Sequence, residues 1–307
     1  MPELVGDDAD RRGFADHDVA VHLDVVRDEA LGTREERLCV ASAAEKAGPG
    51  ATDRTAGDLI DAGLPGFYVY HMVQVQRFYL DRLRVPRDRF RFAELDERER
   101  AFYNKIHYDI QVWQESLGGF KEVGGVHYRT DHDLSGHAAA SRRDLAVQVG
   151  DRKVLPHVLE LSFGVDRNVW ALLDAGYETG ARDVLHLPPA IAPVTVGVFP
   201  LLSKQGLPER ATVLYRELRA AYDAFYDEGG SIGKRYARMD EIGTPFCVTV
   251  DHATLEDGTV TLRERDSTAQ VRVPADGLRG ALRGLAEGGI AFSGLGAPVS
   301  PREKESD

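Results

Sequence analysis

The chain contains only two cysteines, Cys39 and Cys247, which lie far apart in apolar surroundings. Two cysteines exclude both a disulfide framework and a four-cysteine zinc site. No window reaches about 18 uninterrupted apolar residues, so no transmembrane helix is expected. The acidic first ten residues lack the apolar stretch of a signal peptide. These absences predict a protein of the reducing cytoplasm, with no structural metal and no contact with a membrane.

The net charge of -12 limits the kinds of partner that the chain can bind. Proteins that coat nucleic acids without sequence preference are usually basic, so this chain is not expected to be one of them. A local basic patch for one RNA remains compatible with the total charge. With 307 residues, the chain is long enough to bury two hydrophobic cores.

A proline-rich segment, residues 187–193, marks the expected boundary between two domains. After this segment strands and helices alternate, which is typical of an α/β domain. The expected strands cover residues 19–26, 121–127, 156–163, 194–202, 245–250, 259–264 and 270–273. The expected helices cover residues 67–84, 166–175, 208–226, 231–242 and 275–285.

Glu160 and Ser162 are isolated polar residues in the apolar strand expected over residues 156–163. Side chains two positions apart in a strand point to the same face. A glutamate in such a strand costs free energy unless it is paired, and a substrate ammonium would supply the partner. The alternative is a plain buried strand in which a neighbouring arginine pairs with Glu160. Gly164 then leaves room for a nucleotide near the backbone, and Arg167 offers a planar fork for phosphate oxygens.

Three blocks of this sequence resemble one family. Residues 160–167 (ELSFGVDR) resemble motif 3 of class II aminoacyl-tRNA synthetases, in the form Glu-x-Ser-x-Gly-x-Asp-Arg that glycyl-tRNA synthetases carry. Residues 120–134 (FKEVGGVHYRTDHDL) resemble a second block of these enzymes, with Phe120 at a tryptophan position. Residues 229–251 closely resemble the anticodon-binding domain that the glycyl, threonyl, prolyl and histidyl enzymes share, and SIGKRYARMDEIGTP within them is specific to the glycyl branch.

The resemblance implies a mixed α+β and α/β fold in three parts. Residues 1–187 would be a partial class II catalytic domain built on an antiparallel sheet, with motif 3 at 156–174. Residues 190–288 would be an α/β anticodon-binding domain, and residues 289–307 a flexible tail. The implied function is that of a cytoplasmic glycine–tRNA ligase, which uses ATP, accompanied by Mg²⁺, to activate glycine and transfers the glycine to tRNA(Gly). The complete enzyme is expected to be a homodimer.

The resemblance also assigns residues to sites. The catalytic residues would be Arg167 and Glu160, and the glycine site Glu122, Glu160, Leu161, Ser162, Phe163 and Gly164. The ATP site would contain Glu122, Val123, Gly164, Val165, Asp166 and Arg167. Arg129 would lie close to Glu122, and the alternative for Arg129 is a surface pair with Asp131.

Lys234, Arg235 and Arg238 are the residues expected to bind tRNA. They put positive charge on one short predicted helix, which suits an RNA backbone. The alternative is a solvated face in which Asp240 and Glu241 pair with these cations at helical spacing.

Motif 1 and the arginine-bearing motif 2 of the class II enzymes are not found in this sequence. Three possibilities follow: the C-terminal part of a glycine–tRNA ligase, acting with a separate N-terminal chain that carries both motifs; a catalytically inactive accessory subunit that binds RNA or DNA; or a truncated fragment. The retained Glu122, Glu160, Ser162, Asp166 and Arg167 favour the first. Without the motif 2 arginine, the chain alone is not expected to exchange pyrophosphate into ATP with glycine.

Overall fold

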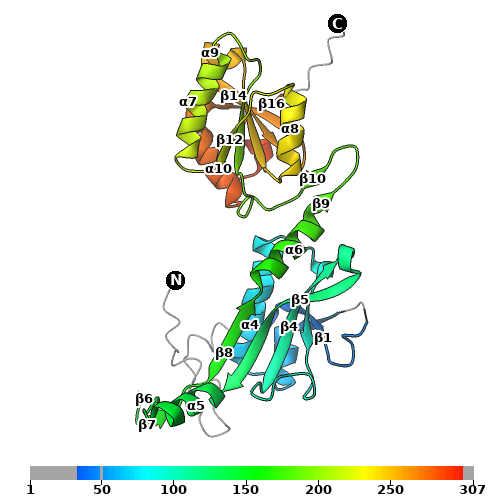
Figure 1. The fold of residues 1–307 in the computed structure, drawn as a ribbon, viewed down its shortest axis with the longest axis vertical. Helices are drawn as coiled ribbons and strands as arrows, with labels where there is room; N and C mark the ends of the chain where they lie inside the picture. The colour runs from blue at the N-terminus through cyan, green and yellow to red at the C-terminus, as the bar shows by residue number, and fades with distance from the viewer. Residues whose placement is uncertain (1–32, 49–50, 300–307) are drawn as a thin grey trace. The chain divides into compact units, whose positions relative to one another are not determined.

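The computed structural model describes residues 33–48 and 51–299, so the strand expected over residues 19–26 lies outside the described residues. The chain divides into two compact units, Met1–Ala175 and Gly176–Asp307 (Figure 1). The sequence placed residues 176–187 with the first domain. In the structure they include a two-stranded hairpin, β9 (Tyr177–Glu178) and β10 (Val184–Leu185), that packs on α8 (Ile232–Glu241) of the second unit.

The N-terminal unit is built on a six-stranded sheet in the order β2-β1-β3-β4-β5-β8. Neighbouring strands are antiparallel except for β1 and β3, which are parallel. The strands are β1 (Arg37–Ala41), β2 (Thr52–Thr55), β3 (Phe90–Glu94), β4 (Ile106–Gln114), β5 (Gly119–Thr130) and β8 (Val158–Phe163). A helix, α5 (His132–Ser141), and a small hairpin, β6 (Val147–Val149) and β7 (Arg152–Val154), connect β5 to β8.

One face of this sheet packs against α4 (Gly66–Arg77), which follows the short helix α3 (Ala56–Asp61). The aromatic stripe that predicted an amphipathic helix is buried here, since Phe67, Tyr68 and Met72 are at most 2% exposed. The Tyr68 hydroxyl donates to the Val126 carbonyl at 2.7 Å. The helix continues as the π-helical turn η1 (Phe78–Arg82). This packing makes one side of the sheet the core of the unit.

The opposite face of the sheet carries polar side chains, which we call the polar face. Residues alternate along β4, so that Tyr108, Ile110 and Val112 are buried against the core while the intervening side chains point the other way. A β-bulge at Val123 keeps Glu122 on the same face as Gly125, because these residues pair with Gln111 and Asp109 respectively. The polar face contains Arg91, His107, Asp109, Gln111, Trp113, Phe120, Glu122, His127, Arg129, Glu160 and Ser162.

The strand–turn–helix unit expected around motif 3 is present. β8 ends at Phe163, and α6 (Val165–Gly176) begins immediately after Gly164. The Gly164 amide donates to the Val123 carbonyl at 2.9 Å, and the Asn168 side chain donates to the same carbonyl at 2.9 Å. These bonds fix the start of α6 against the bulge in β5, so Arg167 on its first turn lies beside β5.

The C-terminal unit is a second six-stranded sheet, in the order β12-β11-β13-β14-β15-β16, with helices on both faces. Helices α7 (Leu207–Arg219) and α10 (Leu278–Ala286) pack on one face and α8 on the other, as Figure 1 shows. The strands are β11 (Val196–Pro200), β12 (Ala224–Tyr226), β13 (Phe246–Val250), β14 (Thr259–Glu264), β15 (Gln270–Pro274) and β16 (Ala297–Pro298). The short helix α9 (His252–Asp257) connects β13 to β14.

Part of the segment expected as a flexible tail is ordered. Phe292, in the 3-10 turn η5 (Phe292–Gly294), is 8% exposed and joins the hydrophobic core. β16 pairs with β15, placing Pro298 opposite Val271. The tail prediction is therefore wrong for residues 292–298, because one buried aromatic ring and a strand pairing hold them to the sheet. Residues 300–307 lie outside the described residues.

Candidate functional site

Glu160 and Ser162 lie on the same side of β8, as their spacing predicted. Glu160 is paired with His127 and Ser162 with Gly125 on β5, and both side chains reach partners on the polar face. Arg129 Nη1 donates to Glu160 Oε2 at 2.6 Å. His127 Nε2 lies 3.1 Å from Ser162 Oγ. The two groups therefore form one site above the sheet.

Arg129 is the partner that Glu160 needs in its partly buried position. Its guanidinium also forms two hydrogen bonds of 2.7 Å with Asp133, and it lies 4.3 Å from the centre of the Tyr103 ring. The salt bridge to a neighbouring arginine, the alternative left open for Glu160, is thus present. The expected Arg129–Asp131 pair is not, since Asp131 accepts from Ser135 instead. Arg129 fixes one carboxylate oxygen of Glu160 and leaves Oε1 without a printed bond in the described residues.

Two histidines that the sequence did not assign to the site lie directly over Gly125. The rings of His107 and His127 are 4.0 Å apart between centroids. A Cβ on Gly125 would lie 2.4 Å from His127 Nε2, so only glycine lets this ring lie down on the sheet. Alternation along β5 could have revealed His127, because it stands between Gly125 and Arg129 at two-residue spacing.

Burial is the main cause that lowers the pKa of His127, and the neighbouring His107 adds to it. The imidazole is then neutral near pH 7. Its folded-state pKa lies below its unfolded value, so the unfolded chain binds the proton more readily, and stability falls as the pH drops below about 6.5. We expect His127→Gln to reduce this pH dependence of the N-terminal unit. Urea unfolding between pH 5 and 8 measures the effect, and identical pH dependence in both proteins would contradict it.

Glu122 and Arg167 meet at the other end of the same face. Glu122 Oε2 lies 3.0 Å from Arg167 Nη1, and both side chains are about half exposed. These two residues and Asp166 border a hollow of about 550 Å³, whose other lining residues are Gln114, Leu117, Lys121 and Trp170. The structure therefore brings three of the residues assigned to ATP together.

Two residues assigned to the glycine site point away from it. Leu161 and Phe163 alternate with Glu160 and Ser162, so their side chains lie on the opposite side of β8. The Phe163 ring lies 6.4 Å from the Tyr79 ring on the core side. Only the backbone of these two residues can face the polar side. Val123 is fully buried, whereas Val165 is 74% exposed at the start of α6.

The three cations expected to bind tRNA have different environments on α8. Lys234 is exposed. Arg238 is half exposed and donates to Asp227 at 2.9 Å and to the Gly229 carbonyl at 2.7 Å. Arg235 is only 3% exposed and donates to the carbonyls of Pro200, Glu228 and Gly230. The assignment of Arg235 to tRNA is therefore corrected, because its guanidinium holds loops of the domain together and cannot reach an RNA backbone.

Asp240 does not pair with its helical neighbours either. It is 1% exposed and forms a bidentate ion pair with Arg263, at 2.8 and 3.0 Å, and a third bond to Arg182 at 2.8 Å. Arg182 lies between the strands of the β9–β10 hairpin. This buried network ties the hairpin, α8 and β14 into one unit.

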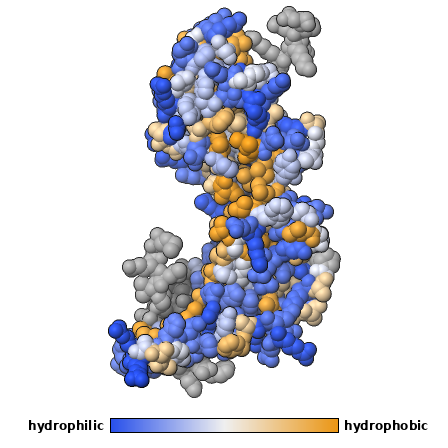
Figure 2. Space-filling model, viewed as in Figure 1, coloured by the Kyte–Doolittle hydropathy of each residue, from blue (hydrophilic) through white to orange (hydrophobic). Residues whose placement is uncertain are grey.

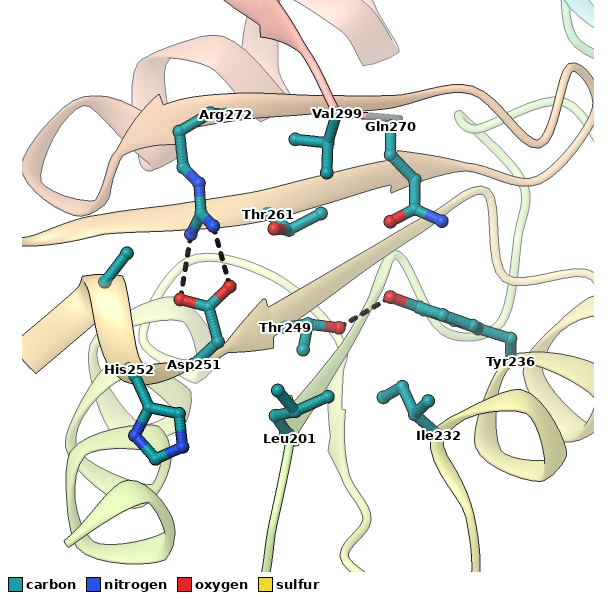
Figure 3. A pocket seen from close by; sticks show the side chains of 11 residues that line it. Leu201, Ile232, Tyr236, Thr249, Asp251, His252, Thr261, Gln270, Arg272 and Val299 are labelled. Atoms are coloured by element: carbon teal, nitrogen blue, oxygen red, sulfur yellow. Dashed lines mark hydrogen bonds and ion pairs between the residues drawn. The ribbon is translucent and has the colours of Figure 1, made fainter. Parts of the chain in front are cut away.

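A pocket of about 390 Å³ opens beside α8 on the sheet of the C-terminal unit (Figure 3). Two pairs of polar residues line it: Asp251 accepts two bonds from Arg272, at 2.8 and 2.9 Å, and Tyr236 bonds Thr249 at 2.6 Å. The other lining residues are Leu201, Ile232, His252, Ala253, Thr261, Gln270 and Val299. Apolar walls with a few fixed polar groups suit a flat, partly polar ligand.

Metal and membrane sites were searched over residues 33–48 and 51–299. This part of the chain holds no group of three or more His, Cys, Asp or Glu side chains arranged to bind a metal ion. None of its helices is both long and apolar enough to cross a membrane.

Residues 192–285 match the family model of the anticodon binding domain. Over 221 residues the chain is 41% identical to a glycine–tRNA ligase of Treponema denticola, an alignment that covers 68% of this chain and 48% of the relative. The chain is related in sequence to glycyl-tRNA synthetases. A glycine–tRNA ligase of Aeropyrum pernix is 35% identical over 308 residues, covering 76% of this chain and 52% of the relative.

A third glycine–tRNA ligase, from Chlorobaculum tepidum, is 41% identical over 204 residues, covering 64% of this chain and 43% of the relative. The chain thus spans about half the length of the curated relatives it matches. The resemblance to the C-terminal half of glycyl-tRNA synthetases is confirmed, and so is the anticodon-binding part of the expected fold.

Proposed function

We propose that this chain supplies the glycine-binding and tRNA-binding parts of a cytoplasmic glycine–tRNA ligase, which activates glycine with ATP and transfers it to tRNA(Gly). The observation that carries the proposal is the placement of Glu160 and Ser162 side by side on the polar face. A fixed carboxylate and a hydroxyl are the groups that a small ammonium substrate requires.

Glycine would bind with its ammonium group between Glu160 Oε1 and Ser162 Oγ. Arg129 and His127 would act as positioning residues, because each holds one of these side chains by a direct bond. The rings of His107 and His127 already fill the space directly above Gly125. The remaining room suits the smallest amino acid, and a site can reject larger amino acids by volume alone.

ATP would bind at the hollow that Glu122, Asp166 and Arg167 border. Arg167 offers a guanidinium for the phosphates or for stacking on adenine. Glu122 and Asp166 are the carboxylates available there for a magnesium ion that accompanies the nucleotide, in keeping with the preference of Mg²⁺ for oxygen ligands. Glu122 would exchange part of its pairing with Arg167 for these ligands.

Isothermal titration of the full chain with a non-hydrolysable glycyl-adenylate analogue tests this site. We expect Glu160→Gln to weaken binding roughly 10- to 100-fold, because a hydrogen bond to a charged group is lost. The matched control is Glu217→Gln on α7, whose exposed glutamate lies in the other unit. Equal affinity for the alanyl analogue, or no binding of either, would contradict the glycine site. Binding of tRNA without the analogue would leave an RNA-binding role only.

The C-terminal unit would bind the anticodon of tRNA. The pocket in Figure 3 would accept an unstacked base, whose edge could bond Gln270 or Arg272 while apolar walls cover its faces. Lys234 and the partly exposed Arg238 would contact the backbone.

The remaining half of the enzyme, in this or in a separate chain, would cover the outer side of β8 and α6. β8 is an edge strand in the described part of the sheet. Along α6, Val165, Val169 and Leu173 are 40–74% exposed, and Figure 2 shows apolar side chains gathered over this helix. Such a surface is typical of an interface. A homodimer of the complete enzyme is part of the same proposal.

A further inference from the structure

Phe102 is the most exposed large apolar side chain of the described residues, at 89%. It lies in the loop between β3 and β4, and its ring stands edge-on to two neighbours. The centroid of Phe102 is 5.3 Å from that of Tyr103 and 5.5 Å from that of His132, at interplanar angles of 72° and 87°. The chain therefore presents a fixed aromatic ring to solvent.

The three rings continue directly from the candidate glycine site. The Tyr103 and His132 rings are nearly parallel, 26° apart in plane and 6.0 Å between centroids. The Arg129 guanidinium covers the Tyr103 ring at 4.3 Å and donates to Glu160 at 2.6 Å. A row of flat groups thus leads from Glu160 outward to Phe102, and we call Phe102, Tyr103 and His132 the aromatic row.

The surroundings of the aromatic row suit a nucleobase better than a protein surface. Protein docking sites expose contiguous apolar area, whereas the residues before Phe102 in the loop are charged and largely exposed, Asp96 to Arg100. Lys105, three residues after Phe102, is also exposed. Single exposed aromatic rings among cationic side chains are the usual means of holding an unpaired base and its phosphate.

We propose that the aromatic row stacks the unpaired 3′-terminal base of a tRNA, with Phe102 as the ring that contacts it. This inference rests on the proposed function, because a tRNA that receives glycine must bring its 3′ end to the polar face. Tyr103, covered by Arg129, would then link the position of that base to the carboxylate of Glu160.

A tRNA(Gly) transcript with 2-aminopurine as its 3′-terminal base tests the inference on the full chain. Fluorescence of 2-aminopurine falls when the base stacks on an aromatic ring, while filter binding measures total affinity independently. We expect the parent chain to quench the terminal base on binding. Phe102→Ala should abolish most of the quenching and weaken any contribution of the terminal base about tenfold, whereas Phe102→Tyr should retain both.

Phe225→Ala is the matched control, since Phe225 is an exposed phenylalanine of the C-terminal unit, 43% exposed. It should leave the quenching unchanged. Binding of tRNA without quenching, or equal quenching by the parent and Phe102→Ala, would overturn the aromatic row as a base site and leave the proposed function intact. Failure of the parent chain to bind tRNA would overturn both. Circular dichroism of Phe102→Ala checks that the fold is retained.

Discussion

Asp240→Ala is expected to lower the free energy of unfolding of the C-terminal unit by about 3–5 kcal/mol, because it leaves a buried arginine without its counter-ion. Arg263 is 5% exposed, and Asp240 supplies both of its carboxylate bonds. The same change releases Arg182 and with it the β9–β10 hairpin. For a unit of this size the loss corresponds to a fall in the unfolding midpoint of roughly 10 °C or more.

Glu241→Ala is the matched control for this prediction. Glu241 is the next residue on α8, and it is exposed. We expect its replacement to change the free energy of unfolding by no more than about 0.5 kcal/mol. Thermal and urea unfolding of the three proteins measure the difference. If Asp240→Ala and Glu241→Ala unfold alike, the buried network does not hold the unit together.

Arg235→Ala and Lys234→Ala, adjacent on α8, are expected to have opposite kinds of effect. Arg235 donates to three backbone carbonyls while almost fully buried, so its removal leaves several acceptors unsatisfied. The expected cost is about 3 kcal/mol or more of folding free energy, since each lost bond to a charged donor contributes about 1.5–3 kcal/mol. Lys234 is exposed, and its replacement should leave stability unchanged.

Lys234→Ala should instead act on tRNA binding. Loss of one phosphate contact should lower the slope of log affinity against log salt by about one unit. Filter binding across a salt series, paired with urea unfolding of each variant, separates the two effects. A stable Arg235→Ala protein with a reduced salt slope would restore Arg235 to the RNA surface. An unchanged slope in Lys234→Ala would remove Lys234 from it.

The sequence alone determined the elements whose pattern is local. The strand at residues 259–264 was expected with the bounds that β14 has, and the shared face of Glu160 and Ser162 follows from strand alternation. The helix expected over residues 208–226 ends at Arg219, however, and β12 (Ala224–Tyr226) follows it. The periodicity of these residues fits a helix, but Val196, Gly197 and Val198 of β11 offer a strand partner that no local pattern reveals.

Partners and burial were decided only by the tertiary structure. The charge of Arg235 reads the same in the sequence as that of Lys234, yet one side chain is enclosed by loop carbonyls and the other is solvated. Glu160 could equally have awaited a ligand or an arginine, and the register of β5 against β8 brought Arg129 within 2.6 Å of it. Local sequence sets which way a side chain points, whereas the long-range pairing of strands sets what it meets there.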